Sequence, residues 1–379
     1  MQVSAPDRDL VRSLAELRLD RPVVLSLYLN LDPSQFATPP ARKTAVRSLV
    51  DEAERRLRER NGLSHDDKLA LQAALERATG FLENELPSDG AHGLAVFASE
   101  PSDLFEALKL PRSVPNRVAI GHSPLVGPLA RLARRERWCV TLVNRRDARI
   151  LRGSPDGLRE VEQIHDDVSG QHDQGGWSQA RYQRHIDKLV HDHLKEVAEL
   201  VDRQLRRLRG PRVIVVATDE TRSEFENALS NDVKKAVIGW TAADAHATAA
   251  ELLGEVQPLL ESWRGEQETR AVERWREETG RNGRAAAGWR QTLEAASDGR
   301  IELLLFQEGA DRPAWECPAC GRVGADGGAC PLDGTAMEQR REGLDLAVRQ
   351  TLAHGGTVWA LAQRRDLEPV EGIGALLRF

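Results

Sequence analysis

The sequence lacks several features that would assign it to a common class of protein. It has no run of about 18 apolar residues, the length that a membrane-spanning helix needs. Its start contains early acidic side chains and no apolar segment, so we expect no secretory signal. A Walker loop and a convincing dinucleotide fingerprint are both missing, so nothing favours nucleotide chemistry. We expect a cytoplasmic protein with no membrane partner.

Cysteine is scarce, at four residues in 379. Three of them lie close together near the C-terminus, at positions 317, 320 and 330. This usage indicates a metal site in a reducing compartment rather than a disulfide framework. The fourth, Cys139, lies inside an apolar run that is typical of a strand, and we predict an inert core residue there.

The overall composition is that of a globular protein, with 40% hydrophobic and 30% charged residues. Its length suggests two or three domains. The net charge is −6. This balance is compatible with a nucleic-acid partner, because only the contacting face of such a protein must be basic.

The order of periodic segments predicts a mixed α/β protein with three domains, which we place at residues 1–135, 136–255 and 256–379. In the first domain, apolar and β-branched runs predict strands at 22–30, 94–98 and 118–120. Charged segments with helical apolar spacing predict helices at 41–60 and 64–84. This domain contains no catalytic motif that we can identify.

The central segment begins with a predicted hairpin, formed by strands at 138–143 and 148–153. A polar stretch at about 162–185 follows, and then an amphipathic helix at about 186–209 and a buried strand at 213–217. Hairpin, polar loop, helix, strand and helix is the order of a ribonuclease-H-like layered domain.

Residues 241–279 are predicted to be helical throughout and to form an exposed connecting helix. The last segment alternates between strands and helices, which predicts a three-layer α/β domain. Its strands are expected at 301–305 and 357–361, its helices near 286–297 and 343–353, and a cysteine-bearing insert at 315–336.

The polar stretch contains the string QHDQGGWSQARYQRH, from Gln171 to His185. Gly175 and Gly176 permit backbone conformations that other residues resist, and they let the backbone approach a ligand closely. Arg181 and Arg184 are three positions apart, so they would share a helix face and could grip phosphates. The alternative is an ordinary glycine loop before a helix.

A basic run near the end of the predicted helix has two interpretations. It either complements the helix dipole and is solvated, or it contacts RNA phosphates. The run consists of Arg203, Arg206, Arg207, Arg209 and Arg212. On the same helix, His185, His191 and His193 suggest a metal cluster, but positions two apart point in different directions. We therefore predict surface histidines.

The spacing of the C-terminal cysteines predicts a structural zinc ribbon. Cys317 and Cys320 form one C-x2-C pair, and nine residues later Cys330 and Asp333 form a C-x2-D pair. Thiolates suit zinc, and a carboxylate is an acceptable fourth ligand. The alternative is a degenerate ribbon that has lost its metal. A catalytic zinc is not expected, since no nearby side chain resembles a base.

The glycine-containing string resembles the Gly-Gly-Gln loop of the archaeo-eukaryotic class-I release factors, which leads into a long helix. The positions that fit this pattern are Gly175, Gly176, Ser178, Ala180, Arg181, Tyr182 and Arg184. Trp177 stands where the family has its catalytic glutamine, and Gln179 follows two positions later. This form is similar to bacterial members of the release-factor and Pelota superfamily. They include the Balon type of ribosome hibernation factor and relatives of the peptidyl-tRNA-cleaving protein Vms.

The resemblance extends over about residues 136–379. It implies a ribonuclease-H-like central domain, and a C-terminal domain with the fold of the kink-turn-binding ribosomal proteins, which often carries a zinc insert. Residues 1–135 do not resemble the decoding domain of the eukaryotic factors, so codon-specific termination is not expected.

The resemblance further implies a factor that enters the ribosomal A site and reaches the ribosomal RNA of the peptidyl transferase centre. The residues expected to contact RNA there are Gly175, Gly176, Trp177, Ser178, Gln179, Arg181 and Arg184. The resemblance is also compatible with a translational GTPase and transfer RNA as further partners.

Because Trp177 replaces the glutamine, we expect hibernation or rescue of stalled ribosomes by occupancy, with no catalytic residue. One alternative is an enzyme that hydrolyses peptidyl-tRNA or cleaves transfer RNA, using Gln179. Another is a stress-regulated RNA-binding protein without a ribosomal role.

Overall fold

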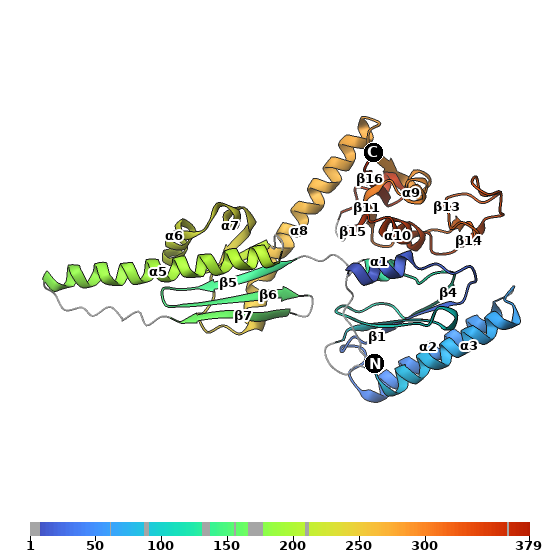
Figure 1. The fold of residues 1–379 in the computed structure, drawn as a ribbon, viewed down its shortest axis with the longest axis horizontal. Helices are drawn as coiled ribbons and strands as arrows, with labels where there is room; N and C mark the ends of the chain where they lie inside the picture. Colours follow the sequence, from blue (N-terminus) through green and yellow to red (C-terminus); the bar gives the residue numbers. More distant parts are fainter. Residues whose placement is uncertain are drawn as a thin grey trace. The chain divides into compact units, whose positions relative to one another are not determined.

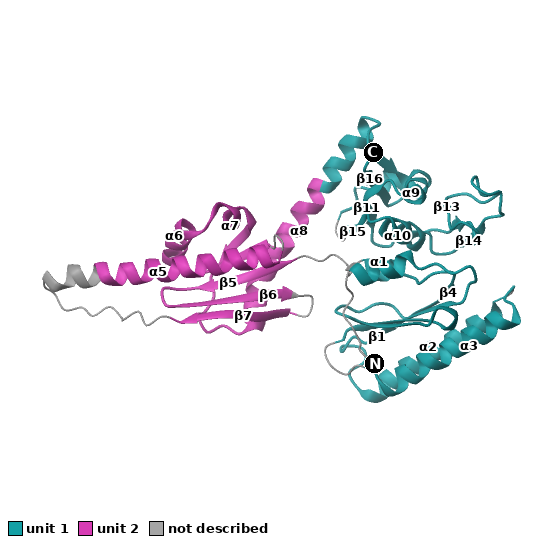
Figure 2. Cartoon of the chain, in the orientation of Figure 1, with its two compact units in different colours: residues 1–135, 271–379 teal, residues 136–270 magenta. Residues whose placement is uncertain are grey.

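A computed structural model of the protein describes residues 8–60, 62–86, 91–130, 137–154, 157–165, 177–208, 212–361 and 364–379. The chain forms two compact units (Figure 2). Unit 1 contains residues 1–135 and 271–379, and unit 2 contains residues 136–270. The predicted mixed α/β class is confirmed, whereas the three-domain division stays a prediction. Among the described residues, no helix combines the length and apolar character needed to cross a bilayer.

The N-terminal part of unit 1 is an antiparallel sheet in the order β3-β2-β1-β4. Its strands are β1 (Val24–Asn30), β2 (Gly93–Ser99), β3 (Leu104–Leu110) and β4 (Arg117–Gly121). Helices α2 (Pro39–Glu59) and α3 (His65–Asn84) pack on one face of this sheet. Each helix starts at a capping side chain, Thr38 for α2 and Ser64 for α3. The strands and helices predicted in this region are confirmed, and β3 is an addition.

The other face of this sheet packs against the C-terminal part of the chain. Helix α1 (Arg8–Glu16) and the short helix α4 (Gly127–Ala130) also contribute to this core. One buried cluster therefore joins residues far apart in the sequence: Val11, Leu14, Tyr28, Phe97, Trp289 and Leu346. The rings of Tyr28 and Phe97 meet edge to face at 5.9 Å, and the Tyr28 hydroxyl donates to Leu125 O at 2.5 Å. This shared core is the reason that residues 1–135 and 271–379 form one unit.

The C-terminal sheet of unit 1 has the order β10-β16-β11-β15. Its strands are β10 (Ala285–Ala287), β11 (Ile301–Gln307), β15 (Thr357–Leu361) and β16 (Ile373–Leu377). Helices α9 (Gly288–Ser297) and α10 (Gly343–Ala353) pack on one face through the shared core. On the other face, Trp275 near the end of α8 (Ala249–Gly280) packs against Leu305 and Leu376. The three-layer arrangement predicted for this segment is confirmed (Figure 1).

Unit 2 is built on a mixed sheet in the order β7-β6-β5-β8-β9. The strands are β5 (Trp138–Val143), β6 (Asp147–Ser154), β7 (Gly157–His165), β8 (Arg212–Val216) and β9 (Val237–Thr241). Strands β5, β6 and β7 are antiparallel, while β5, β8 and β9 are parallel. Helices α5 (Trp177–Arg207), α6 (Asp219–Ala228) and α7 (Asn231–Ala236) pack on one face, and the first half of α8 packs on the other. This is the layered, ribonuclease-H-like arrangement that the sequence predicts.

Three details of unit 2 differ from the sequence prediction. Helix α5 begins at Trp177 rather than near 186, so the end of the predicted polar stretch, residues 177–185, is helical. The expected continuous helix over 241–279 is wrong at its start, because β9 ends at Thr241 and α8 begins only at Ala249. Strand β7 was not predicted, because its sequence is rich in charged residues and none of its side chains is fully buried, so no apolar alternation stands out. Cys139 is buried, as predicted, and burial raises the pKa of its thiol to about 12.

We expect Leu14→Ala to destabilise the full chain by about 2–5 kcal/mol, because Leu14 is buried in the shared core and its loss leaves a cavity. Leu69→Ala is the matched control: this leucine is also helical but 51% exposed, and its replacement should change stability by no more than about 0.5 kcal/mol. Urea-induced unfolding measures both. Equal, small effects would mean that α1 is not part of the core.

Candidate functional site

The cysteine-bearing insert is a small sheet in the order β13-β12-β14. Its strands are β12 (Ala314–Glu316), β13 (Val323–Gly324) and β14 (Glu338–Arg340). Two five-residue turns, 317–321 and 330–334, bring the four predicted ligands together. The sequences of these turns are Cys-Pro-Ala-Cys-Gly and Cys-Pro-Leu-Asp-Gly.

The two turns have the same backbone geometry. In each, the glycine N–H donates to the carbonyl of the first cysteine at 2.9 Å, from Gly321 to Cys317 and from Gly334 to Cys330. Both glycines adopt a left-handed conformation, with φ of +78° and +75°, which residues with a side chain resist. Asp333 therefore occupies in the second turn the position that Cys320 occupies in the first. This repeat could have been read from the sequence, because each turn carries Pro and Gly at the same places.

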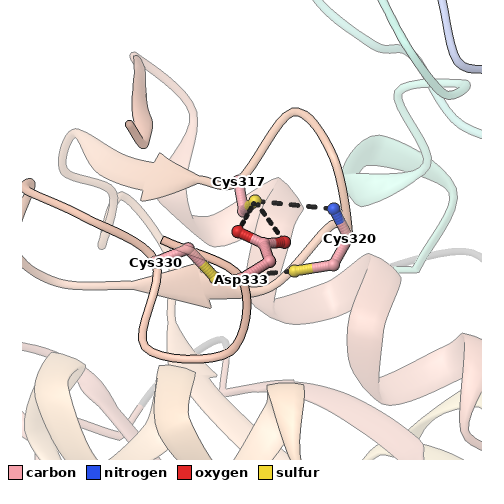
Figure 3. A group of neighbouring side chains, drawn as sticks. All are labelled: Cys317, Cys320, Cys330 and Asp333. Atoms are coloured by element: carbon pink, nitrogen blue, oxygen red, sulfur yellow. Dashed lines mark hydrogen bonds between the residues drawn. The ribbon is translucent and has the colours of Figure 1, made fainter. Parts of the chain in front are cut away.

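The four side chains converge on one point (Figure 3). All four ligand atoms lie within 4.8 Å of one another. Cys320 Sγ and Cys330 Sγ are 3.6 Å apart, and Cys317 Sγ is 3.4 Å from Asp333 Oδ2. A tetrahedral zinc site with Zn–S bonds of ~2.3 Å and a Zn–O bond of ~2.1 Å gives S···S and S···O separations of about 3.8 and 3.6 Å. The cluster could therefore hold a metal ion.

The chemistry of the donors also fits a metal ion. The Thr335 N–H donates to Asp333 Oδ1 at 2.9 Å, and this bond holds the pKa of the Asp333 carboxyl below its ordinary range. Asp333 is thus a carboxylate at neutral pH and available as a ligand. The Cys320 N–H points at Cys317 Sγ, 3.4 Å away, so the backbone of the first turn orients this sulfur.

A buried ionic group supports β12, the strand that leads into the first turn. Glu316 is 3% exposed, and its carboxylate accepts from Arg349 Nη2 at 2.5 Å and from Arg340 Nε at 3.1 Å. The two arginines come from α10 and β14. Nothing in the sequence indicated these residues, because no spacing links Glu316 to Arg349, 33 positions later.

The loop residues expected to contact RNA belong to unit 2. Gly175 and Gly176 lie outside the described residues. Trp177, Ser178, Gln179 and Arg181 form the first turns of α5, and their side chains lie beyond what the structure describes. Arg184, also in α5, is exposed. The assignment of these residues to RNA binding stays a prediction.

The other candidates on α5 separate into two groups. His185 and His191 are exposed, as predicted, but His193 is 2% exposed, so its placement on the surface was wrong. It occupies the helix face that packs on the sheet. In the basic run, three arginines are exposed: Arg203, Arg206 and Arg207. Arg209 lies outside the described residues, and the Arg212 guanidinium lies 5.4 Å from the ring centre of Trp263.

Comparison with known proteins gives a match to one family model. Residues 124–261 match the model described as "Bacterial archaeo-eukaryotic release factor family 10". This segment includes all described strands of unit 2, helix α5 and the glycine-containing string.

Two archaeal proteins, each described as peptide chain release factor subunit 1, are also similar. The protein from Methanopyrus kandleri is 28% identical over 201 residues, which are 50% of this chain and 48% of that protein. The one from Methanobrevibacter smithii is 27% identical over 199 residues, 49% of this chain and 47% of that protein. The chain thus spans about half the length of the curated relatives it matches.

Among solved structures, that of Pelota from Archaeoglobus fulgidus is similar to this chain. The alignment covers 76% of this chain and 79% of the Pelota chain. The sequence identity is 16% and the TM-score is 0.34.

We expect the purified full-length protein to carry about one divalent metal ion per chain, measured by elemental analysis. Asp333→Ala should weaken binding by more than the ~10–100-fold that loss of an outer-shell partner costs, because it removes a ligand. Asp333→Cys should retain the metal, since it restores a four-thiolate set. Asp326→Asn, at an exposed acid of the same insert, is the control and should leave the metal content unchanged. Unchanged metal binding in Asp333→Ala would contradict this ligand set.

Proposed function

We infer that the chain belongs to the archaeo-eukaryotic release-factor and Pelota superfamily, and from this premise we propose that it is a translation factor that binds the ribosome. The observation that carries the proposal is the family match over residues 124–261, which contains the Gly-Gly-Trp-Ser-Gln string together with the helix that follows it. The names of the archaeal relatives as release factors support it.

In the proposed mode of action, unit 2 enters the ribosomal A site and presents the end of α5 to the peptidyl transferase centre. The helix is 31 residues long, about 47 Å at 1.5 Å per residue, so it can carry the loop well beyond the sheet. Arg184 and the exposed arginines of the basic run offer positive charge along the same helix. Such side chains bind the phosphates of ribosomal RNA without reading its sequence.

We propose that the factor acts by occupancy, in hibernation or in rescue of stalled ribosomes, and not by releasing the peptide. A release factor must hold water close to the ester carbon of peptidyl-tRNA. The Trp177 indole has one N–H donor and no acceptor, so it cannot reproduce the two-way hydrogen bonding of an amide. Gln179 lies two positions further on, inside the first turn of α5, where residues two apart are on different sides of the helix. The position of the helix start therefore supports a binder rather than a hydrolase.

We further propose that the metal ion in unit 1 is zinc, in a structural role. Cys317, Cys320, Cys330 and Asp333 would hold it, and it would supply the cross-link that fixes the two turns of the insert. A rigid insert on the C-terminal sheet would suit docking to the base of the ribosomal stalk or to a translational GTPase.

Charge reversal at Arg181 and Arg184 should weaken ribosome binding and reduce the salt dependence of the affinity by roughly one unit of slope for each phosphate that is no longer neutralised. Sedimentation with vacant and with translating ribosomes, at several salt concentrations, measures both effects. The control is Arg58→Glu, a helical arginine of unit 1 whose side chain is 69% exposed. If both reversals left binding unchanged, α5 would not be the RNA-contacting element.

Wild-type protein should bind ribosomes but release little or no peptide from bound peptidyl-tRNA in a single-turnover assay. Trp177→Ala should weaken docking, because a large aromatic side chain stacked on bases contributes ~1–3 kcal/mol. Gln179→Ala should leave binding intact, as should the control Gln257→Ala in α8. If the wild-type protein released peptide rapidly and Gln179→Ala abolished this release, the protein would be a peptidyl-tRNA hydrolase and the occupancy proposal would be wrong.

A further inference from the structure

Arg18, in the segment that follows α1, lies against the first metal-binding turn, 299 positions away in the sequence. Its Nη2 donates to Cys317 O at 3.1 Å and to Pro318 O at 2.6 Å. Its Nε lies 3.8 Å from Glu316 Oε1, the carboxylate that precedes the turn. The Arg18 side chain is only 17% exposed. The N-terminal segment thus contacts the backbone of the candidate metal centre directly.

The first turn, residues 317–321, leaves space for the Arg18 side chain because it ends in a glycine. Gly321 adopts φ of +78°, and a Cβ at this position would lie 2.9 Å from Arg18 Nε. Gly334, its equivalent in the second turn, has φ of +75°, but a Cβ there would have nothing within 4 Å. Both glycines satisfy the same backbone requirement, and Gly321 in addition leaves room for a guanidinium. Gln350 of α10 fixes the same turn by donating to Gly321 O at 2.7 Å.

The backbone next to Arg18 is anchored in the N-terminal part of unit 1. Leu19 N donates to His122 O at 2.7 Å, and His122 Nδ1 donates to Leu19 O at 3.0 Å. On the other side of Arg18, α1 packs on α10 through Val11 and Leu14. The α1 helix has nine residues, too few for a stable isolated helix, so its helicity depends on docking.

We propose that the metal centre controls the docking of residues 8–19: metal binding fixes the turn whose two carbonyls accept from Arg18, and metal loss weakens the attachment of α1. The proposal rests on the metal-binding function proposed above. Without the metal, the turn from Cys317 to Gly321 keeps its backbone hydrogen bond but loses the link to the second turn, and its two carbonyls are held less firmly toward the guanidinium. The apolar contacts of α1 remain, so the segment loosens rather than leaves. The coupling is reciprocal, because two events that stabilise each other do so by the same factor.

Hydrogen exchange of the full-length protein, with zinc bound and after chelation, tests this coupling. Chelation should speed the exchange of the α1 amides about tenfold or more, as expected for loss of hydrogen bonds from a charged donor. Arg18→Ala should give the same fast exchange with zinc bound and should make α1 insensitive to chelation. It should also lower zinc affinity, measured by competition with a chromogenic chelator, by the same factor.

Two matched controls separate the coupling from general damage. Arg12→Ala removes an exposed arginine of α1 that pairs with Glu16 and should leave exchange and zinc affinity unchanged. Gly321→Ala and Gly334→Ala impose the same backbone strain on equivalent turns. At saturating zinc only Gly321→Ala, whose Cβ would lie 2.9 Å from Arg18 Nε, should loosen α1.

The outcomes distinguish the coupling from the metal site itself. The coupling is wrong if removal of zinc from the wild-type protein does not speed the exchange of the α1 amides. It is also wrong if Arg18→Ala binds zinc with wild-type affinity. In both cases the proposal of a metal site is unaffected. Wild-type protein that binds no metal would overturn both.

Discussion

The buried cluster shared by the two ends of the chain is the constraint on which the rest of unit 1 depends. The N-terminal sheet has apolar side chains on both faces, and helices α2 and α3 cover only one of them. The second face, which contains Tyr28 and Phe97, is covered by α1 and by residues of the C-terminal part, among them Trp289 and Leu346. Neither part could bury this surface alone. Unit 1 is therefore formed by both ends of the chain, and residues 136–270, which form unit 2, lie between these two parts in the sequence.

This arrangement explains why a metal centre can matter beyond its own insert. The insert follows β11 and is tied by Glu316 to Arg349 of α10, the same helix that supports α1. A buried carboxylate between arginines is costly to break, since removal of one partner leaves a charge without compensation. In the proposed coupling, a change in the turns would therefore act on a packed helix rather than on a solvent-exposed loop alone.

The family match covers most of unit 2, whereas most of unit 1 lies outside it. The match ends within α8, and the two cysteine-bearing turns and Arg18 lie outside it. The family match over residues 124–261 supports the proposed binding of the ribosome through α5. The contribution of residues 1–135 follows instead from the core that they share with the C-terminal sheet.

The sequence by itself determined what depends on neighbours along the chain. Alternating and helical apolar patterns predicted most strands and helices. The spacing of Cys317, Cys320, Cys330 and Asp333 predicted a set of side chains that the structure brings together in a cluster that could hold a metal ion. It did not predict β7 or the start of α5, where charged and polar side chains mask the period. Only the tertiary structure decided that α1 packs on α10, that His193 is buried, and that Arg18 contacts Cys317 and Pro318. The physical reason is that contacts between segments hundreds of residues apart follow from how whole surfaces pack, and they leave no spacing or period in the sequence.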